Sequence, residues 1–227
     1  MGASGSFPID IVLFAGIAIF LVLRLRSVLG RRQGFERPPE PQPQPMAREA
    51  TPPPAAPAGR VIDAVAEPVP ARTLPAPDSP EGQTLARMAQ IDANFHPDRF
   101  LDGAETAFRL IVGAFAAGNR AALKPLLSDD TYNAFDTAIT ARETAGETQR
   151  TEIKAIPATT IEHAELRGNT AAITVRFISD QINLTLDRDG APAAGADAVA
   201  EINDVWTFER DLGSPDPTWR LVAARSA

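Results

Sequence analysis

Between residues 97 and 118, apolar residues recur at spacings of three and four positions, which is the pattern of one face of an amphipathic helix. Pro97 suits the first turn because its fixed φ is helical and its missing N–H would be unpaired there, while Gly118 can adopt the left-handed conformation just past the end. A surface pair four residues apart, Glu105 and Arg109, adds little stability. We therefore expect this helix to be stabilised mainly by what packs on its apolar face. That face consists of Leu101, Ala104, Phe108, Ile111 and Phe115.

Shorter helical patterns flank this segment on both sides. On the N-terminal side, Leu85, Met88, Ile91 and Phe95 keep helical spacing. Interfacial membrane helices normally carry a basic polar face, whereas the arginines here are offset by aspartates. A helix that covers the domain is therefore favoured over one that contacts a membrane or a partner.

On the C-terminal side, Asn119 can cap a short turn that contains three leucines. Ser128 can cap a third helix, because Asp129 and Asp130 place negative charge in its first turn, where it suits the helix dipole. Gly146 is predicted to end this helix. The inward stripe of the third helix consists of Tyr132, Phe135 and Ile139.

From Thr151 onward the period changes to two, which is typical of strands. One alternating run passes through Val175, and a second passes through Leu184 after a register shift near Asp180, which predicts a β-bulge.

The remaining turn signals complete the sheet. A turn region is predicted from Asp189 to Gly195, and residues 213–217 should join a strand through Trp206 to a strand through Trp219 as a hairpin. Helices followed by long strands predict an α+β fold, with N-terminal helices packed on a curved antiparallel sheet.

Residues 7–23 are apolar except for Asp10, and as a helix they would span about 26 Å at about 1.5 Å per residue. A buried core helix would usually show a polar face, and a cleaved signal peptide would need basic residues before its apolar stretch. Here the basic residues follow it. By the positive-inside rule, residues 1–32 are predicted to be a retained transmembrane signal anchor with the N-terminus outside and everything after Leu23 in the cytoplasm. The arginines that set this orientation are Arg24, Arg26, Arg31 and Arg32.

Residues 33–80 are predicted to be a disordered linker, since 14 of the 21 prolines fall between positions 37 and 81 and such a composition cannot bury enough apolar surface to offset its ordering entropy. Residues 81–227 then form one folded domain with 14 basic and 22 acidic residues. An acidic domain is a poor nucleic-acid binder, so we expect no nucleic-acid partner.

Candidate chemistry is sparse. The chain has no Cys and two His, which excludes disulfides and argues against an imidazole-rich or thiolate metal site, and we expect no cofactor. Phosphate-binding loops and Ser/His/Asp signatures are absent. The candidate acid–base residues are Tyr132, His163, Asp180 and Asp204. Because nothing in the sequence brings two of them together, structural roles are favoured over catalysis.

Four stretches of the folded segment together resemble a known family. They are FHPDRFLDGAETAFRLIVGAFAAGNRAALKPLLSDDTYNAF, RETAGET, ITVRFIS and VWTFERDLGSPDPTWRLVA. In this combination, over residues 95–225, the chain resembles the Tim-forty-four-like (Tim44-like) domain, and its anchor and proline-rich tether resemble those of bacterial members. The resemblance implies a cone-shaped fold similar to nuclear transport factor two. For the mitochondrial relative it also implies chaperone tethering at a translocon and contact with lipid, although this chain lacks that protein's long charged region.

We therefore predict a non-catalytic adaptor or scaffold in the bacterial inner membrane, which binds protein partners of the inner membrane or translocon in protein translocation or envelope assembly. Lipid contact is a further expectation from the resemblance. The alternative is a small-molecule-binding or enzymatic cone-fold domain, of the isomerase or dehydratase type, with a pocket under Phe108 and Trp206. Converging buried carboxylates would favour the alternative, and a shallow apolar groove would favour the adaptor. The candidate groove residues are Phe100, Phe108, Ile111, Phe115, Tyr132, Trp206 and Trp219.

Overall fold

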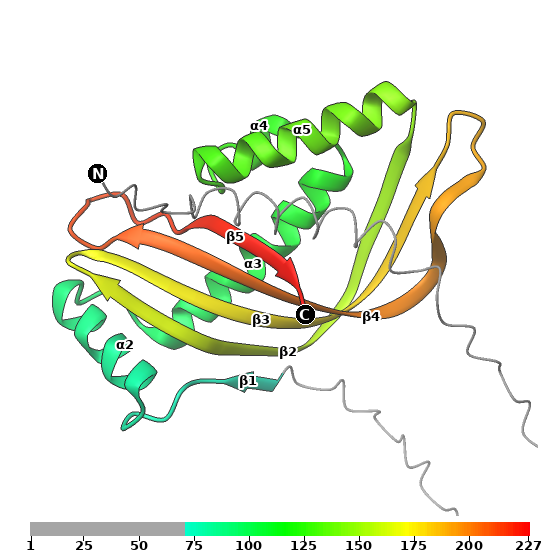
Figure 1. The fold of residues 1–227 in the computed structure, drawn as a ribbon. Helices are drawn as coiled ribbons and strands as arrows, with labels where there is room; N and C mark the ends of the chain where they lie inside the picture. The colour runs from blue at the N-terminus through cyan, green and yellow to red at the C-terminus, as the bar shows by residue number, and fades with distance from the viewer. Residues whose placement is uncertain (1–70) are drawn as a thin grey trace, which may run out of the picture. The chain divides into compact units, whose positions relative to one another are not determined.

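Five strands form one sheet in the part of the chain that the computed structural model describes, residues 71–227 (Figure 1). The strands lie in the order β1–β2–β3–β4–β5, antiparallel except for β1, which runs parallel to β2. The predicted α+β class and the hairpin of the last two strands are confirmed. In chain order the elements are β1 (Ala71–Thr73), α2 (Pro80–Ile91), α3 (Pro97–Ala116), α4 (Arg120–Leu123), α5 (Asp129–Ala145), β2 (Thr148–Arg167), β3 (Thr170–Leu186), β4 (Pro192–Asp211) and β5 (Arg220–Ser226).

The predicted anchor and most of the predicted linker lie outside the described residues, so both stay predictions. Within residues 71–227, no helix is long and apolar enough to cross a membrane.

The helix ends follow the predicted capping signals. Gly118 has a φ of 66°, and its N–H donates to the carbonyl of Phe115. Ser128 accepts a hydrogen bond from the N–H of Thr131 at the start of α5, and Gly146 closes that helix with a φ of 73°. Local chemistry therefore sets where these helices begin and end.

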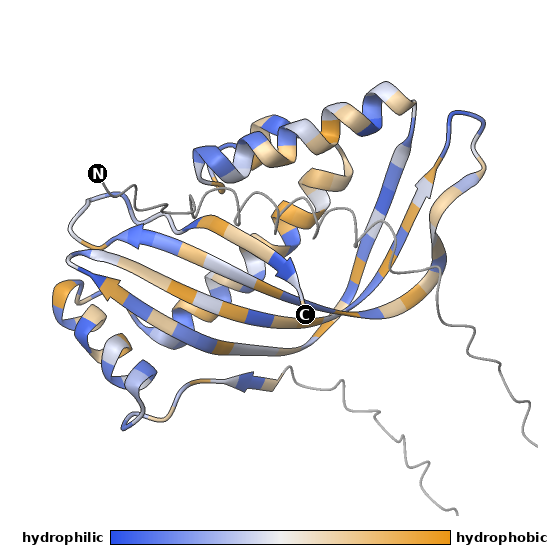
Figure 2. Ribbon diagram, in the orientation of Figure 1, coloured by the Kyte–Doolittle hydropathy of each residue, from blue (hydrophilic) through white to orange (hydrophobic). Residues whose placement is uncertain are grey.

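Alternating hydropathy along the long strands, visible in Figure 2, gives the sheet one face that packs on the helices. The apolar face of α3 lies on this sheet, and the ring of Phe108 is completely buried there. It stacks on Phe177 of β3 with 4.5 Å between ring centroids and contacts Trp206 of β4 at 4.7 Å. This three-ring contact is the centre of the core, and it joins α3 to two neighbouring strands.

Arg142 ties α5 to the end of α3 from inside the core. Its Nη2 donates to the carbonyl oxygens of Phe115 and Ala116 at 2.8 and 3.1 Å. Burial lowers the pKa of this guanidinium, which also lies over the Phe115 ring. Positive charge at the C-terminal carbonyls of a helix is stabilising, so Arg142 offsets part of its desolvation by capping α3.

The predicted bulge near Asp180 is confirmed, and the extra residue lies on β2, the strand that pairs with β3 at this point. The register between β2 and β3 shifts between Ile153 and Ala155, opposite Gln181 and Asp180. The turn before β4 is shorter than predicted, because Asp187 accepts hydrogen bonds from two backbone N–H groups and closes it before Pro192.

Two structural features, β1 and the Ser79 cap of α2, lie within the last ten residues of the range 33–80 that was predicted to be a linker. Arg72 of β1 donates hydrogen bonds to Asp102 and Glu105 of α3. The helical spacing predicts a pair between Glu105 and Arg109, whereas in the structure Glu105 pairs with Arg72. The proline content of this segment does not indicate that one of its residues forms ion pairs with a helix about 30 residues later.

An ion pair joins the end of α2 to the hairpin of β4 and β5. Asp92 lies 2.9 Å from a guanidinium nitrogen of Arg210, and the side chains are only 10% and 13% exposed. The hydrogen bond from the Asn94 backbone N–H, helped by the charge of Arg210, holds the pKa of Asp92 below its ordinary value of 3.8. A carboxylate with a depressed pKa stabilises the fold above its ordinary pKa, and that contribution is lost as the pH falls through the lowered value.

Replacing Asp92 by Asn should therefore lower the free energy of unfolding at pH 7 by about 1 to 3 kcal/mol, because Arg210 loses its charged partner. The difference in free energy of unfolding between the variant and the wild-type chain should have its largest value at about pH 5 and above, and should shrink as the pH falls below about 3.8. Urea unfolding at several pH values measures it, with Asp189→Asn in an exposed turn as the control. A difference between wild type and Asp92→Asn that stays constant into acid would contradict this assignment.

Candidate functional site

A pocket of about 510 Å³ opens between the first half of α3 and the turn that joins β4 to β5. Four aromatic rings line or support it: Phe95, Phe100, Phe208 and Trp219. Phe100 meets Trp219 edge-on with 4.8 Å between ring centroids, and Phe95 lies 5.9 Å from Trp219. Because Phe95 and Phe100 are buried while Trp219 is partly exposed, the rings form a floor that solvent can reach on one side.

Two short hydrogen-bonded turns place these rings. In the corner between α2 and α3, the carboxylate of Asp92 accepts from the N–H of Asn94, and the N–H of Phe95 donates to the Asp92 carbonyl. In the turn after β4, Asp211 accepts from the N–H of Gly213, and Asp216 accepts from the N–H of Thr218. The pocket therefore lies where two Asx-type turns, distant in sequence, meet.

The charged residues at the pocket edge differ in whether they form an ion pair within the domain. Arg210 pairs with Asp92, and Asp102 pairs with Arg72, which also pairs with Glu105. Arg99 also lines the pocket, is exposed, and forms no ion pair with any residue in the range 71–227. Arg99 is thus a positive charge at the pocket edge that pairs with no carboxylate of residues 71–227.

The outward face of α3 continues the pocket as a strip of small and apolar residues. Gly103, Ala107 and Leu110 follow one another along this face, and all three line the pocket. A Cβ atom placed on Gly103 would meet nothing within 4 Å, so the space above this turn is open. Leu110 is 55% exposed, although it lies between the buried residues Phe108 and Ile111.

The structure divides the predicted groove residues into three groups. Phe100 and Trp219 line the pocket, as described. Tyr132 is half-buried on α5, where Lys124 lies over its ring at 4.5 Å from the centroid. The other four are buried in the core and make the contacts between α3 and its neighbours: Phe108, Ile111, Phe115 and Trp206.

Sequence reasoning missed Arg99, Leu110 and Phe208 as pocket residues. Phe95 had been recognised only as part of a covering helix. The sequence did offer a signal for Leu110, which is a large apolar residue off the three- and four-residue spacing of the stripe that faces the sheet.

The candidate acid–base residues do not come together. His163 is exposed on β2, with its Nδ1 at 3.5 Å from the carboxylate of Glu81 on α2. Asp180 is opposite Ala155, about 20 Å along the sheet from the pairing of His163 with Thr174. Asp204 is completely buried opposite Phe177, so it lies on the other face of the sheet from Asp180.

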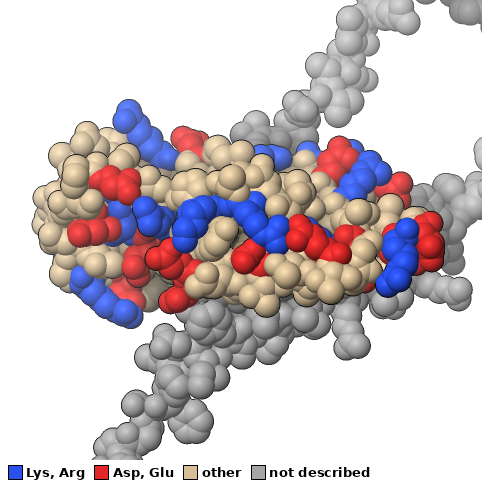
Figure 3. Space-filling view, turned by 90° about the horizontal axis from the view of Figure 1, so that it is seen from above, with Lys and Arg blue, Asp and Glu red and all other residues tan. Residues whose placement is uncertain are grey.

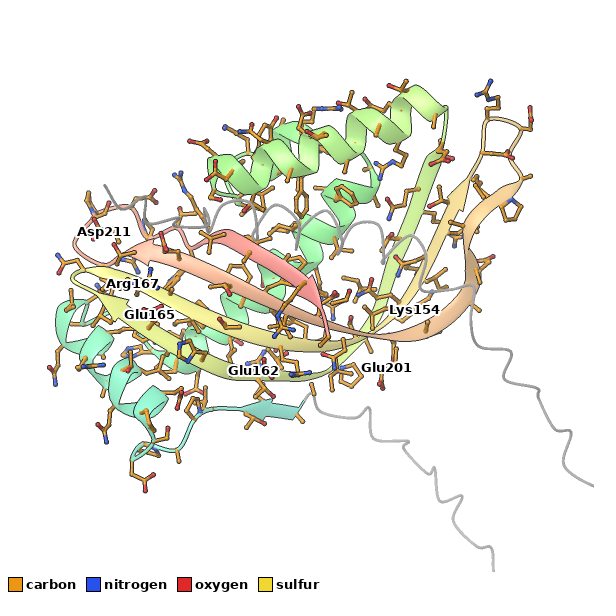
Figure 4. The ribbon with its side chains drawn as sticks, in the orientation of Figure 1. Lys154, Glu162, Glu165, Arg167, Glu201 and Asp211 are labelled. Atoms are coloured by element: carbon orange, nitrogen blue, oxygen red, sulfur yellow. The ribbon has the colours of Figure 1, made fainter. Side chains whose placement is uncertain are left out.

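Charged side chains elsewhere are dispersed over the described surface. Figure 4 shows labelled residues spread along the sheet, from Arg167 and Asp211 at one end to Lys154 and Glu201 further along the strands. In Figure 3, basic and acidic side chains are interspersed on the face that carries α4 and α5. No group of three or more His, Asp or Glu side chains among residues 71–227 could hold a metal ion.

Comparisons with known structures give weak likenesses. The intermembrane space region of the chloroplast protein ARC6 is 9% identical, with a TM-score of 0.43 over 58% of this chain and 97% of that one. A protein of the NTF2-like family from Streptomyces avermitilis is 14% identical, with a TM-score of 0.35 over 57% of this chain and 97% of that one. Scores this low carry no argument, and the cone shape implied by the resemblance stays a prediction.

The sequence itself decides the family. No curated protein matches it significantly. The model of the Tim44-like domain, however, matches residues 81–226, from the second residue of α2 to the end of β5. The predicted resemblance is therefore confirmed, and the chain belongs to the Tim44-like domain family.

Proposed function

We propose that this chain is a membrane-anchored, non-catalytic adaptor of the bacterial inner membrane, whose Tim44-like domain binds a protein partner at the pocket beside α3. Partner binding serves protein translocation or envelope assembly. The observation that carries this proposal is the aromatic floor of Phe95, Phe100 and Trp219 beside an exposed Leu110. Aromatic side chains clustered in a pocket are the residues from which binding hot spots are built.

The arrangement of the titratable residues also supports binding over catalysis. General acid–base chemistry needs a side chain within hydrogen-bond reach of the reacting group, usually with a second group that orients it. His163, Asp180 and Asp204 lie on three strands and do not face a common space. The pocket lining holds a carboxylate, that of Asp102, but this group is already paired with Arg72.

The membrane part of the proposal is supported by residues 7–23 and by the four arginines that follow them. A reporter that is active only in the cytoplasm, fused after Ala227, should be active in intact cells. A reporter that is active only outside the inner membrane should stay silent at the same position. The reverse pair of results would exclude the proposed orientation.

Partner binding can be tested with a photo-crosslinking amino acid at two positions of the full-length chain in native membranes. Leu110 and Val199 are matched for this purpose, because they are 55% and 56% exposed and lie on different elements. We expect discrete crosslinked products from Leu110, beside the pocket, and only background from Val199, on β4. Trp219→Ala should reduce the yield from Leu110 by about tenfold or more.

Equal product patterns from Leu110 and Val199 would contradict the adaptor proposal. A second result would also contradict it: the purified chain converts a small molecule that it binds, and His163→Ala or Asp204→Asn abolishes this conversion although the variant still folds. That second outcome would favour the enzymatic alternative.

A further inference from the structure

The pocket edge and the strip on α3 together indicate what kind of partner segment fits there. We infer that the segment is an amphipathic helix that inserts a large apolar side chain into the pocket, against Phe100 and Trp219, and carries acidic side chains beside its apolar face. This inference rests on the proposed function, because it names the chemistry of the partner at the same pocket.

The shape of the strip favours a helix. From Gly103 to Leu110 the strip is about 10 Å long, at about 1.5 Å per residue, so it offers two turns of α3 to a partner. Small residues at Gly103 and Ala107 leave a shallow channel, and Gly103 has open space above it. A second helix fits such a channel because its ridges of side chains enter the groove between those of α3. Its anchors then recur at three- and four-residue spacing, which matches the extent of the strip.

The charges favour acidic side chains on that helix. Arg99 is exposed at the pocket edge and has no ion-pair partner in the described part of the chain. Asp102 and Arg210, the other charges beside the pocket, are already paired within the domain. An arginine without a carboxylate partner, on a chain of net charge −7, favours a partner segment that brings a carboxylate to this place.

Two labelled synthetic peptides of 18 residues test this inference on the full-length chain in detergent. Both form an amphipathic helix with the same leucine and phenylalanine anchors, and they differ only in carrying glutamates or lysines beside the apolar face. Fluorescence anisotropy measures their affinities. We expect the glutamate peptide to bind at least about fivefold more tightly at low salt, and the preference to shrink at high salt because ion pairs at an exposed edge are screened.

The tryptophans report whether the peptide occupies the pocket. The chain has two, and Trp206 is 1% exposed, so acrylamide quenching reports mainly on Trp219. The glutamate peptide should protect Trp219 from acrylamide. Arg99→Glu should reverse the preference between the two peptides, whereas the control Arg188→Glu, at the exposed turn before β4, should leave it unchanged.

The inference would be overturned by equal binding of both peptides, by tighter binding of the lysine peptide to the wild-type chain, or by an unchanged preference in Arg99→Glu. Protection of Trp219 by phosphatidylcholine vesicles but by neither peptide would show that the pocket takes lipid instead. If neither peptide binds while the Leu110 crosslinks persist, the adaptor proposal stands and only the acidic helix is excluded.

Discussion

The stacking of Phe108 on Phe177, with Trp206 against the same ring, is the contact on which the rest of the domain depends. Burial of one such aromatic side chain contributes about 1.5 to 3 kcal/mol, whereas an exposed ion pair contributes about 0 to 1 kcal/mol. The contact therefore fixes α3 on the sheet and decides which of its faces points inward. Once that face is fixed, Gly103 and Leu110 must point outward. The candidate binding surface is thus a consequence of how the core packs.

Polar contacts at both ends of α3 fix the position of this helix relative to its neighbours. Arg142 caps the carbonyls at its C-terminal end from inside the protein. Near its N-terminal end, the pair of Asp92 and Arg210 joins the corner before α3 to the hairpin that carries Trp219. The two side chains are only slightly exposed, so water screens their attraction weakly. The pair therefore holds the corner before α3 close to the hairpin on the other side of the pocket. It also links the end of α2 to the hairpin that forms one side of the pocket.

Sequence patterns predicted the helices and most strands, because periodicity and caps such as Ser128 and Gly118 are local signals. They did not predict β1, whose place depends on Arg72 meeting acids on α3. The site was predicted only in part for the same reason. Helical spacing shows that Phe108 and Ile111 share a face, but not whether that face meets the sheet or a partner. The pocket forms between α3 and a turn about a hundred residues later, and only the fold brings Phe100 and Trp219 together.

The central claim is that the inner face of α3 builds the fold and its outer face binds the partner. It is tested most directly by measuring the free energy of unfolding and partner capture in membranes for the same two variants of α3. Phe108→Ala should lower the free energy of unfolding by about 3 to 5 kcal/mol. Leu110→Ala should change it by less than about 0.5 kcal/mol and yet reduce partner capture severalfold. Partner capture that Leu110→Ala leaves intact, in a chain of unchanged stability, would contradict the claim.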